Sequence, residues 1–287
     1  MEDSKKESKA KNFIKRYCNN KLAVIGFFTL VLITLIVIIA PPFLPFSEAE
    51  IDPLAFNMPP SAKHLLGGDD VGRDVLSRLL YGGRVSLAVG IFSTAVSVIV
   101  GIPLGMLAAF YRGAFEVVVM RLSDIFMSFP STILILFLVS MFGPSIITVT
   151  VVIGVLGWPK FARQIYGSVL SIREKDYIEG AVAIGAKDKL IITRYILPNA
   201  VAPIFISITF RIASAIILES SLSFLGMGVQ PPAASWGNML YNAQSITVLT
   251  SRPWMWFPPG LALVITILAI NFIGNGMRDA LDPKTRI

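Results

Sequence analysis

Long runs of uncharged, apolar residues alternate along this chain with polar segments. The first run, Leu22–Ala40, holds no charged residue and is followed by the sequence PPFLP. About 20 apolar residues in a helix cross a hydrocarbon core about 30 Å thick, whereas a signal peptide has a shorter apolar core and a small-residue cleavage site. We therefore predict a retained transmembrane helix here. Further apolar runs follow at Val85–Phe110, Val117–Phe142, Ile146–Gly157, Ile196–Leu225 and Trp256–Ile273. The fourth run continues only weakly to Tyr166, because Lys160 and Arg163 interrupt it.

These runs predict an all-α membrane protein with about six transmembrane helices. Proline and glycine within the runs do not exclude helices, because neighbouring helices can satisfy the freed backbone groups. The composition agrees, since 54% of the 287 residues are hydrophobic and only 15% are charged. It excludes a disordered or fibrous chain, a cytosolic enzyme and a disulfide scaffold. Cys18 and His64 are the only residues of their types, so neither an internal disulfide nor a metal site is expected, and we expect His64 to be exposed.

The basic residues are distributed unevenly between the two sides that six spans would create. One side, residues 1–21, 111–121, 160–196 and 277–287, holds 19 Lys and Arg residues, and the other side holds five. Cytoplasmic loops carry the excess of Lys and Arg, so both termini are predicted to be cytoplasmic. The net charge of +7 therefore reflects topology, and no nucleic acid is expected as a partner.

Two long segments, residues 41–83 and 227–255, fall on the predicted external side. They either cap the bundle at the membrane interface or form a docking surface for an external partner. The candidate docking residues are Gly72, Arg73, Asp74 and Trp236. For Asp74 an alternative is that it caps the second helix, and for Trp236 that it lies at the membrane interface, where tryptophan is enriched.

A short amphipathic helix is predicted within the longest cytoplasmic segment. Its apolar side carries Tyr177, Ile178, Ala181, Val182 and Gly185, which recur with helical spacing. A variant capping box formed by Asp176 and Glu179 is expected to begin the helix, and Gly185 to end it. Pro198 is expected near the start of the next membrane helix. Because small residues permit close approach, a protein groove suits this apolar side better than a membrane surface does.

Two pairs of charged residues lie within or beside predicted spans. Arg211 and Glu219 are eight residues apart and face roughly the same side of the fifth span. They are candidates for lining a polar pathway, and the alternatives are a structural pair or a contact with a partner chain. Arg121 and Asp124 have the spacing of an ion pair at the membrane edge.

The cytoplasmic stretch resembles the coupling loop of bacterial ABC-importer permeases, whose pattern is E-A-A…G…L-P. The matching residues are Glu179, Ala181, Gly185, Leu197 and Pro198; Gly180 stands where the family usually has alanine, and Tyr195 where histidine is frequent. Longer motifs at His64–Gly90, Arg121–Pro130, Ser223–Leu240 and Asn271–Pro283 resemble the peptide/nickel group, although Asn275 replaces a frequent aspartate. The basic tail, single helix and long external segment resemble the C-type subunit of oligopeptide and dipeptide systems.

The resemblance implies a type I ABC-importer transmembrane domain in a bacterial cell membrane. Its expected partners are a homologous second permease, two cytoplasmic ATP-binding subunits, an extracytoplasmic substrate-binding protein and the lipid bilayer. The chain lacks a G-x-x-x-x-G-K-[ST] motif, so we expect a non-catalytic subunit without a bound cofactor, with ATP and Mg held by partner subunits. The expected cargo is an oligopeptide or dipeptide, and the alternative is nickel or a metal chelate. An intramembrane protease is not expected, because it would need a nucleophile and a base at membrane depth. A self-contained channel or secondary transporter is not expected either, because it would have no use for a docking helix.

The resemblance also divides the chain into two predicted parts. Residues 1–83 hold the tail, the first membrane helix and the external segment. Residues 84–287 form a five-helix permease core with a coupling loop at 169–197. The residues expected to form the ATPase-coupling helix and its surroundings are Asp176, Tyr177, Glu179, Gly180, Ala181, Gly185, Ala186 and Pro198.

Overall fold

The computed structural model describes residues 13–281, apart from the side chain of Ala202, and is almost entirely helical. Five segments are long and apolar enough to cross a membrane: α2 (Lys21–Ile39), α3 (Val75–Tyr111), residues 146–173, residues 203–224 and α13 (Pro253–Leu281). A sixth is possible if α4 (Gly113–Ser128) and α5 (Ser131–Phe142), which are bent by 90°, count together. The predicted all-α fold with about six spans is confirmed.

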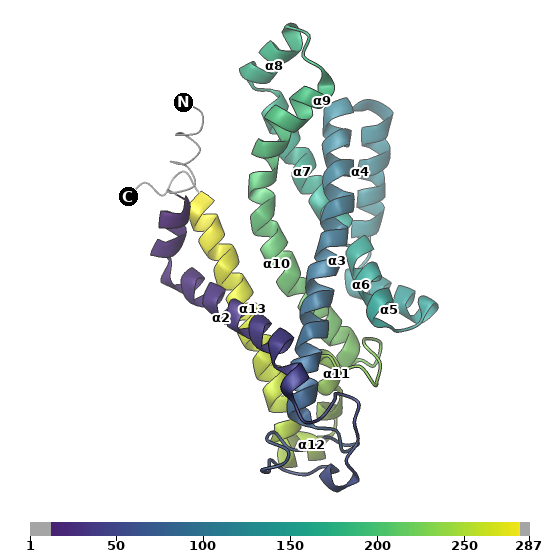
Figure 1. Cartoon of the computed structure of the whole chain (residues 1–287). Coiled ribbons are helices and arrows are strands. Elements are labelled where there is room, and N and C mark those ends of the chain that lie inside the picture. The colour runs from purple at the N-terminus through teal and green to yellow at the C-terminus, as the bar shows by residue number, and fades with distance from the viewer. Residues whose placement is uncertain (1–12, 282–287) are drawn as a thin grey trace.

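The long helix α3 forms the centre of the bundle (Figure 1). It has 37 residues and is therefore about 55 Å long. Asp74 caps its first turn by accepting a hydrogen bond from Ser77 N–H at 2.7 Å, as the sequence suggested. The helix consequently begins ten residues before the predicted span and crosses the predicted boundary between residues 83 and 84. Helix α7 (Trp158–Arg173) packs closely on it, because a Cβ at Gly105 would lie 2.1 Å from Ala162 O.

Two predicted spans are broken by proline or glycine. Between α4 and α5, Phe129 adopts an extended conformation ahead of Pro130, because a residue before proline is disfavoured in the helical region. Between α6 (Ile146–Val155) and α7, the regular helix is interrupted at Leu156–Gly157 before Pro159, although residues 146–173 still form one span. The predicted ion pair of Arg121 with Asp124 is wrong: Asp124 pairs with Arg163 of α7, which ties the two broken spans together.

Helices α2 and α13 lie side by side along one flank of the bundle (Figure 1). Asn20, the N-cap of α2, donates to Asp279 Oδ2 in the last turn of α13 at 2.8 Å. Arg84 of α3 donates to Val37 O and Ile38 O at the other end of α2. The basic residues of the tail and C-terminus on which the predicted orientation partly rests, Lys5, Lys6, Lys9, Lys11, Lys284 and Arg286, lie outside the described residues.

Short helical elements occupy the two ends of the bundle (Figure 1). One end carries α8 (Asp176–Ala183), α9 (Asp188–Leu190) and the π-helical segment η3 (Ile191–Ile196), which continues into α10 (Leu197–Phe224). The opposite end, which we call the outer end after the predicted orientation, carries η1 (Pro41–Phe43), η2 (Pro53–Ala55), α11 (Trp236–Met239), η4 (Tyr241–Gln244) and α12 (Ile246–Ser251). The functional candidates from the sequence lie at these two ends and in α10 between them.

Candidate functional site

Helix α8 is anchored to the bundle through the end of α7. Arg173, in the last turn of α7, donates to Phe110 O at 2.6 Å and stacks over the Phe110 ring, with its guanidinium carbon 5.6 Å from the ring centroid. These contacts join α7 to the last turn of α3. Because α8 begins three residues later, it is held at a fixed place at the end of the bundle.

The apolar side of α8 is divided between the bundle and the surface. Ile178 and Ala181 are 2% and 8% exposed and pack in a cluster with apolar residues of α7 and η3. Tyr177 and Val182 are 45% and 58% exposed, and Ile184 just after the helix is 85% exposed. The predicted apolar side thus exists, but only part of it is left for a partner.

The predicted role of Gly185 in ending α8 is confirmed. Gly185 has φ +76°, and its N–H donates to Val182 O while Ala186 N–H donates to Ala181 O. These two bonds form a Schellman motif, which closes a helix through a residue in the left-handed conformation. Neither Gly180 nor Gly185 would bring a Cβ within 4 Å of another described atom, so both glycines face open space.

The capping box predicted for Asp176 and Glu179 is wrong. Lys175 occupies the N-cap position without a side-chain hydrogen bond, and both acidic residues lie in the first turn. There their negative charges lie beside the positive end of the helix dipole. This attraction stabilises the helix without a side-chain cap. Glu179 is exposed and is therefore available to a partner as well.

Pro198 lies in the first turn of α10, as predicted, but α10 directly continues the six π-helical residues of η3. Proline cannot donate a backbone hydrogen bond, and π-helical turns adjust the hydrogen-bond pattern where a helix is perturbed. Tyr195 of η3 lies near Tyr177 of α8, with ring centroids 6.5 Å apart. Tyrosine at position 195, where related permeases frequently have histidine, thus lies beside α8.

Arg211 is held by the break between α6 and α7. Its Nη2 donates to Ile153 O at 2.7 Å, and Ser97 Oγ donates to Gly154 O at 2.7 Å. Both bonds satisfy carbonyls at the end of α6, where a positive charge also suits the helix dipole. This contact was not predicted from the sequence, because the interruption between α6 and α7 was not predicted either.

Glu219 is enclosed by serine hydroxyls from α3 and α10. Its carboxylate accepts hydrogen bonds from Ser223 Oγ at 2.7 Å and Ser86 Oγ at 3.1 Å, and the side chain is fully buried. Ser86 Oγ also accepts from the backbone N–H of Trp236, which links the carboxylate to α11. Within the described chain, Arg211 and Glu219 form no ion pair, so the alternative of a structural pair between them is wrong.

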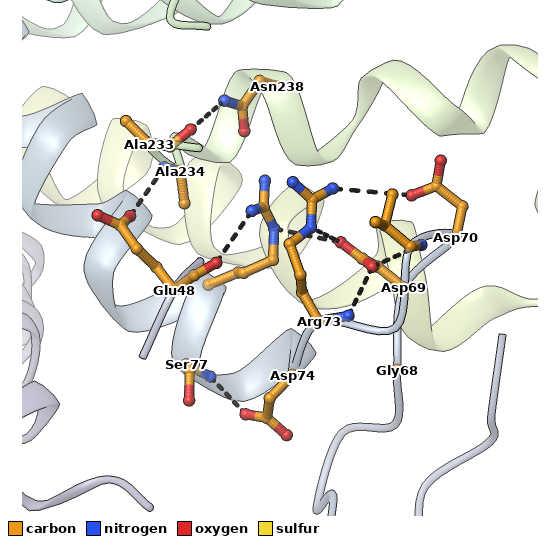
Figure 2. A network of polar contacts seen from close by, with 12 residues as sticks. Glu48, Gly68, Asp69, Asp70, Arg73, Asp74, Ser77, Ala233, Ala234 and Asn238 are labelled. Atoms are coloured by element: carbon orange, nitrogen blue, oxygen red, sulfur yellow. Dashed lines mark hydrogen bonds and ion pairs between the residues drawn. The ribbon is translucent and has the colours of Figure 1, made fainter. Parts of the chain in front are cut away.

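A network of charged residues ties the outer end together, and we call it the outer network. Asp69 is its centre: its Oδ1 accepts from the N–H groups of Val71 and Arg73, and its Oδ2 from Arg73 Nε at 2.7 Å. Arg78 Nε lies 3.4 Å from the same Oδ2, and its Nη1 donates to Glu48 O at 3.2 Å. Glu48 in turn accepts from Ala234 N–H at 2.8 Å, as Figure 2 shows.

The predicted docking residues are mostly buried within or beside this network. Trp236 is 1% exposed, and its Nε1 donates to Leu79 O, so it is a core residue rather than a surface or interfacial one. Asp74 is 4% exposed, and a Cβ at Gly72, where φ is +91°, would lie 2.4 Å from Asp52 O. The side chain of Arg73 is 12% exposed.

His64 is also buried, contrary to expectation. It is 2% exposed, with Nδ1 2.9 Å from Asp74 Oδ1 and Nε2 3.3 Å from Asp52 Oδ2. A lone histidine gave no sequence signal for these contacts, since the two aspartates are 12 residues before it and ten after it. No group of His, Cys, Asp and Glu residues within positions 13–281 could hold a metal ion.

Comparison with known proteins identifies the family. Residues 101–287 match the family described as "Binding-protein-dependent transport system inner membrane component". The chain belongs to this family. Residues 8–60 match the N-terminal TM domain of oligopeptide transport permease C. Both matches agree with the resemblance to ABC-importer permeases found in the sequence, which is thereby confirmed.

Two relatives show how far the similarity extends. The glutathione transport system permease protein GsiD of Pectobacterium atrosepticum is 40% identical over 278 residues, which cover 96% of this chain and 91% of the relative. The dipeptide transport system permease protein DppC of Alkalihalophilus pseudofirmus is 38% identical over 272 residues, which cover 95% and 89%. This chain is thus similar to such permeases over nearly its whole length.

A solved structure supports the fold. The inward-facing MetNI methionine ABC transporter aligns with a TM-score of 0.57 at 22% identity, covering 71% of this chain and 97% of the aligned chain. At that identity the likeness concerns the fold alone. The predicted ABC-importer transmembrane fold is therefore confirmed, and the chain is a multi-pass membrane permease.

Proposed function

We propose that this chain is one permease subunit of an ATP-driven importer of short peptides. The proposal is supported by family membership and by relatives that are named for dipeptide and glutathione transport. Those names favour peptides over the alternative cargo, nickel or a metal chelate. A homologous second permease completes the pathway, an extracytoplasmic binding protein delivers the peptide, and the complex lies in a bacterial inner or cytoplasmic membrane.

The observation that carries the coupling role is the exposed apolar part of α8. Tyr177, Val182 and Ile184 are exposed, although the inner side of the same helix packs tightly on the bundle. Exposed apolar residues grouped together mark interaction surfaces, and the open space at Gly180 and Gly185 allows a partner to approach the backbone. We infer that a cytoplasmic ATP-binding subunit covers this surface and that ATP and Mg are bound there, not by this chain.

The contacts that join α8 to the bundle would transmit a displacement of α8 to the membrane helices. Arg173 joins α7 to the end of α3, and the segment after α8 continues through η3 into α10. A displacement of α8 would therefore move α7 and α10 together. The roles of Arg211 and Glu219 in lining the pathway stay predictions; their contacts support structural roles in this conformation.

Disruption of the exposed part of α8 tests the proposal. The substitution Val182→Asp places a charge on the docking surface without touching the bundle core. We expect the complex to lose its ATP-binding subunits during purification and to lose ATP-dependent dipeptide uptake in proteoliposomes. The control is Leu54→Asp, because Leu54 is an apolar residue at the outer end that is 85% exposed; it should retain the ATP-binding subunits. Normal subunit retention and uptake in the Val182→Asp complex would contradict the coupling role.

A further inference from the structure

A cavity with both polar and apolar lining residues lies at the outer end, beside the outer network. Its volume is about 540 Å³, within the range of small-molecule sites. One wall comes from the segment that leads into α3, and the other from the segment that follows α10. The charged and polar residues that matter here are Asp70, Arg73, Arg78, Gln230, Asn238 and Tyr241.

Both arginines of the cavity wall keep N–H groups that the protein does not use. A guanidinium has five N–H donors. Arg73 commits Nε to Asp69, and Arg78 commits Nε to Asp69 and Nη1 to Glu48 O. The remaining N–H groups at the ends of these side chains make no hydrogen bond with another described residue. Figure 2 shows the Arg73 guanidinium beside Asp69, with its outer end directed towards Asp70.

The acidic groups that hold the arginines are themselves occupied. Asp69 accepts three hydrogen bonds, from Val71 N–H and from the N–H and Nε of Arg73, and Glu48 binds Ala234 N–H. The two guanidinium groups therefore share the Asp69 carboxylate, and Asp70 Oδ1 lies 3.9 Å from Arg73 Nη2. An anion in the cavity would use the free donors in the bidentate manner typical of arginine and carboxylate.

Asp70 presents the opposite charge at the same cavity. Its side chain is 40% exposed, and its contact to Arg73 Nη2 is 3.9 Å, too long for a hydrogen bond. Its Oδ1 has no hydrogen-bond partner among residues 13–281. The cavity thus combines free cationic donors with a carboxylate whose only ion pair is long.

We propose that this cavity binds a short zwitterionic peptide before the peptide enters the membrane pathway. Its C-terminal carboxylate lies on Arg73 and Arg78, and its N-terminal ammonium lies at Asp70. A dipeptide spans roughly 7 Å when extended, which a cavity of this volume accommodates. This inference rests on the proposed function and assigns the permease itself a site that recognises both peptide termini.

The test measures peptide binding to the complex of the two permeases and two ATP-binding subunits, from which the substrate-binding protein is left out. The complex is reconstituted in nanodiscs, and equilibrium binding of radiolabelled alanylalanine is compared with its C-amidated and N-acetylated forms. We expect each modification to weaken binding at least tenfold, because each removes one charge. The substitution Asp70→Asn should weaken binding of the free dipeptide about tenfold and leave binding of the N-acetylated form unchanged. Asp188→Asn, the same change at the opposite end in α9, is the matched control and should have no effect.

The possible results separate this inference from the proposed function. Absence of dipeptide binding, equal binding of the amidated form, or an equal effect of Asp70→Asn on both peptides would overturn the cavity as the site. In each of these cases, normal ATP-dependent uptake of the dipeptide by the complete system would leave the proposed function standing. Absence of uptake with the binding protein and all subunits present would instead contradict the proposed function.

Discussion

The α8 surface and the outer network differ in what they expose and what they bury. At the α8 end, Val182 and Ile184 are 58% and 85% exposed. In the outer network, the side chains of Asp69 and Arg78 are 9% and 4% exposed. Exposed apolar surface is favourable only when a partner covers it, whereas buried charge is tolerated only when it is paired.

This difference separates what the chain does alone from what it does in a complex. The charges at the centre of the outer network, Asp69, Arg73 and Arg78, are paired with one another within the chain. The α8 surface is incomplete until another protein covers it. Substitutions in the network should therefore act on the stability of the isolated chain, and substitutions on the α8 surface should act on assembly.

The largest effect is expected from Asp69→Ala. The substitution removes the carboxylate that holds Arg73 and Arg78 and leaves buried charges without their partner, which costs about 3–5 kcal/mol. Thermal unfolding of the detergent-purified permease measures the loss. Asp70→Ala is the control, because Asp70 is 40% exposed and its only ion pair is long, so its effect should stay below about 1 kcal/mol. Equal losses would show that the network does not depend on Asp69.

A second pair of variants compares the two sides of α8. Ile178→Ala leaves a cavity in the cluster with α7 and η3, and we expect a loss of about 2–5 kcal/mol in the isolated permease. Val182→Ala removes only exposed surface, so the unfolding temperature of the isolated permease should not change. In the complete complex, Val182→Ala should nevertheless weaken retention of the ATP-binding subunits. A stability loss in Val182→Ala but not in Ile178→Ala would mean that Val182, and not Ile178, packs against the bundle.

The sequence predicted the membrane helices well, because uncharged runs of about 20 residues have few alternative structures. It did not predict the breaks within them. Pro130 bends one span by 90°, although Pro103 lies inside the unbroken helix α3. Proline in a membrane helix is compatible with both outcomes, and the packing of neighbouring helices decides between them.

Features of the candidate sites could be predicted from the sequence where they depend on one residue or on close neighbours in the chain. Gly185 ends α8 as expected, since a left-handed C-cap depends on a single residue. The burial of His64 and Trp236 was not predictable, because their partners lie outside their own helix or turn, at ten and 12 positions from His64 and farther still from Trp236. Trp236 donates to Leu79 O, 157 positions earlier, and no periodicity records such a contact.

A pair of glycine substitutions distinguishes backbone effects from docking. Gly185→Ala forces alanine into the left-handed conformation and should destabilise the end of α8 by about 1–2 kcal/mol. Gly180→Ala lies inside the helix, where it meets open space, and should stabilise α8 by about 0.5–1 kcal/mol. Hydrogen exchange of the α8 amides measures both effects. If both substitutions slowed exchange, Gly185 would not have the backbone role assigned to it.

The smallest effect is expected from pH, and it concerns the outer end. Hydrogen bonds from Lys63 Nζ, at 2.5 Å, and then from Leu54 N–H and His64 lower the pKa of Asp52 to about 2. In the unfolded chain the pKa of an aspartate is about 3.9. The stabilisation by Asp52 is therefore complete above about pH 4 and is lost as the pH falls towards 2.

Comparison of the permease with its Asp52→Asn variant isolates this contribution. The variant cannot form the ion pair at any pH, so the difference between their unfolding temperatures should be largest above about pH 4 and should vanish towards about pH 2. The difference should be small, because Lys63 is 62% exposed and exposed ion pairs contribute little. It should also fall at high salt, which screens such pairs, whereas the effect of Ile178→Ala at the α8 end should not. A difference that stays constant down to pH 2 would show that Asp52 stabilises the outer end through contacts that do not need its charge.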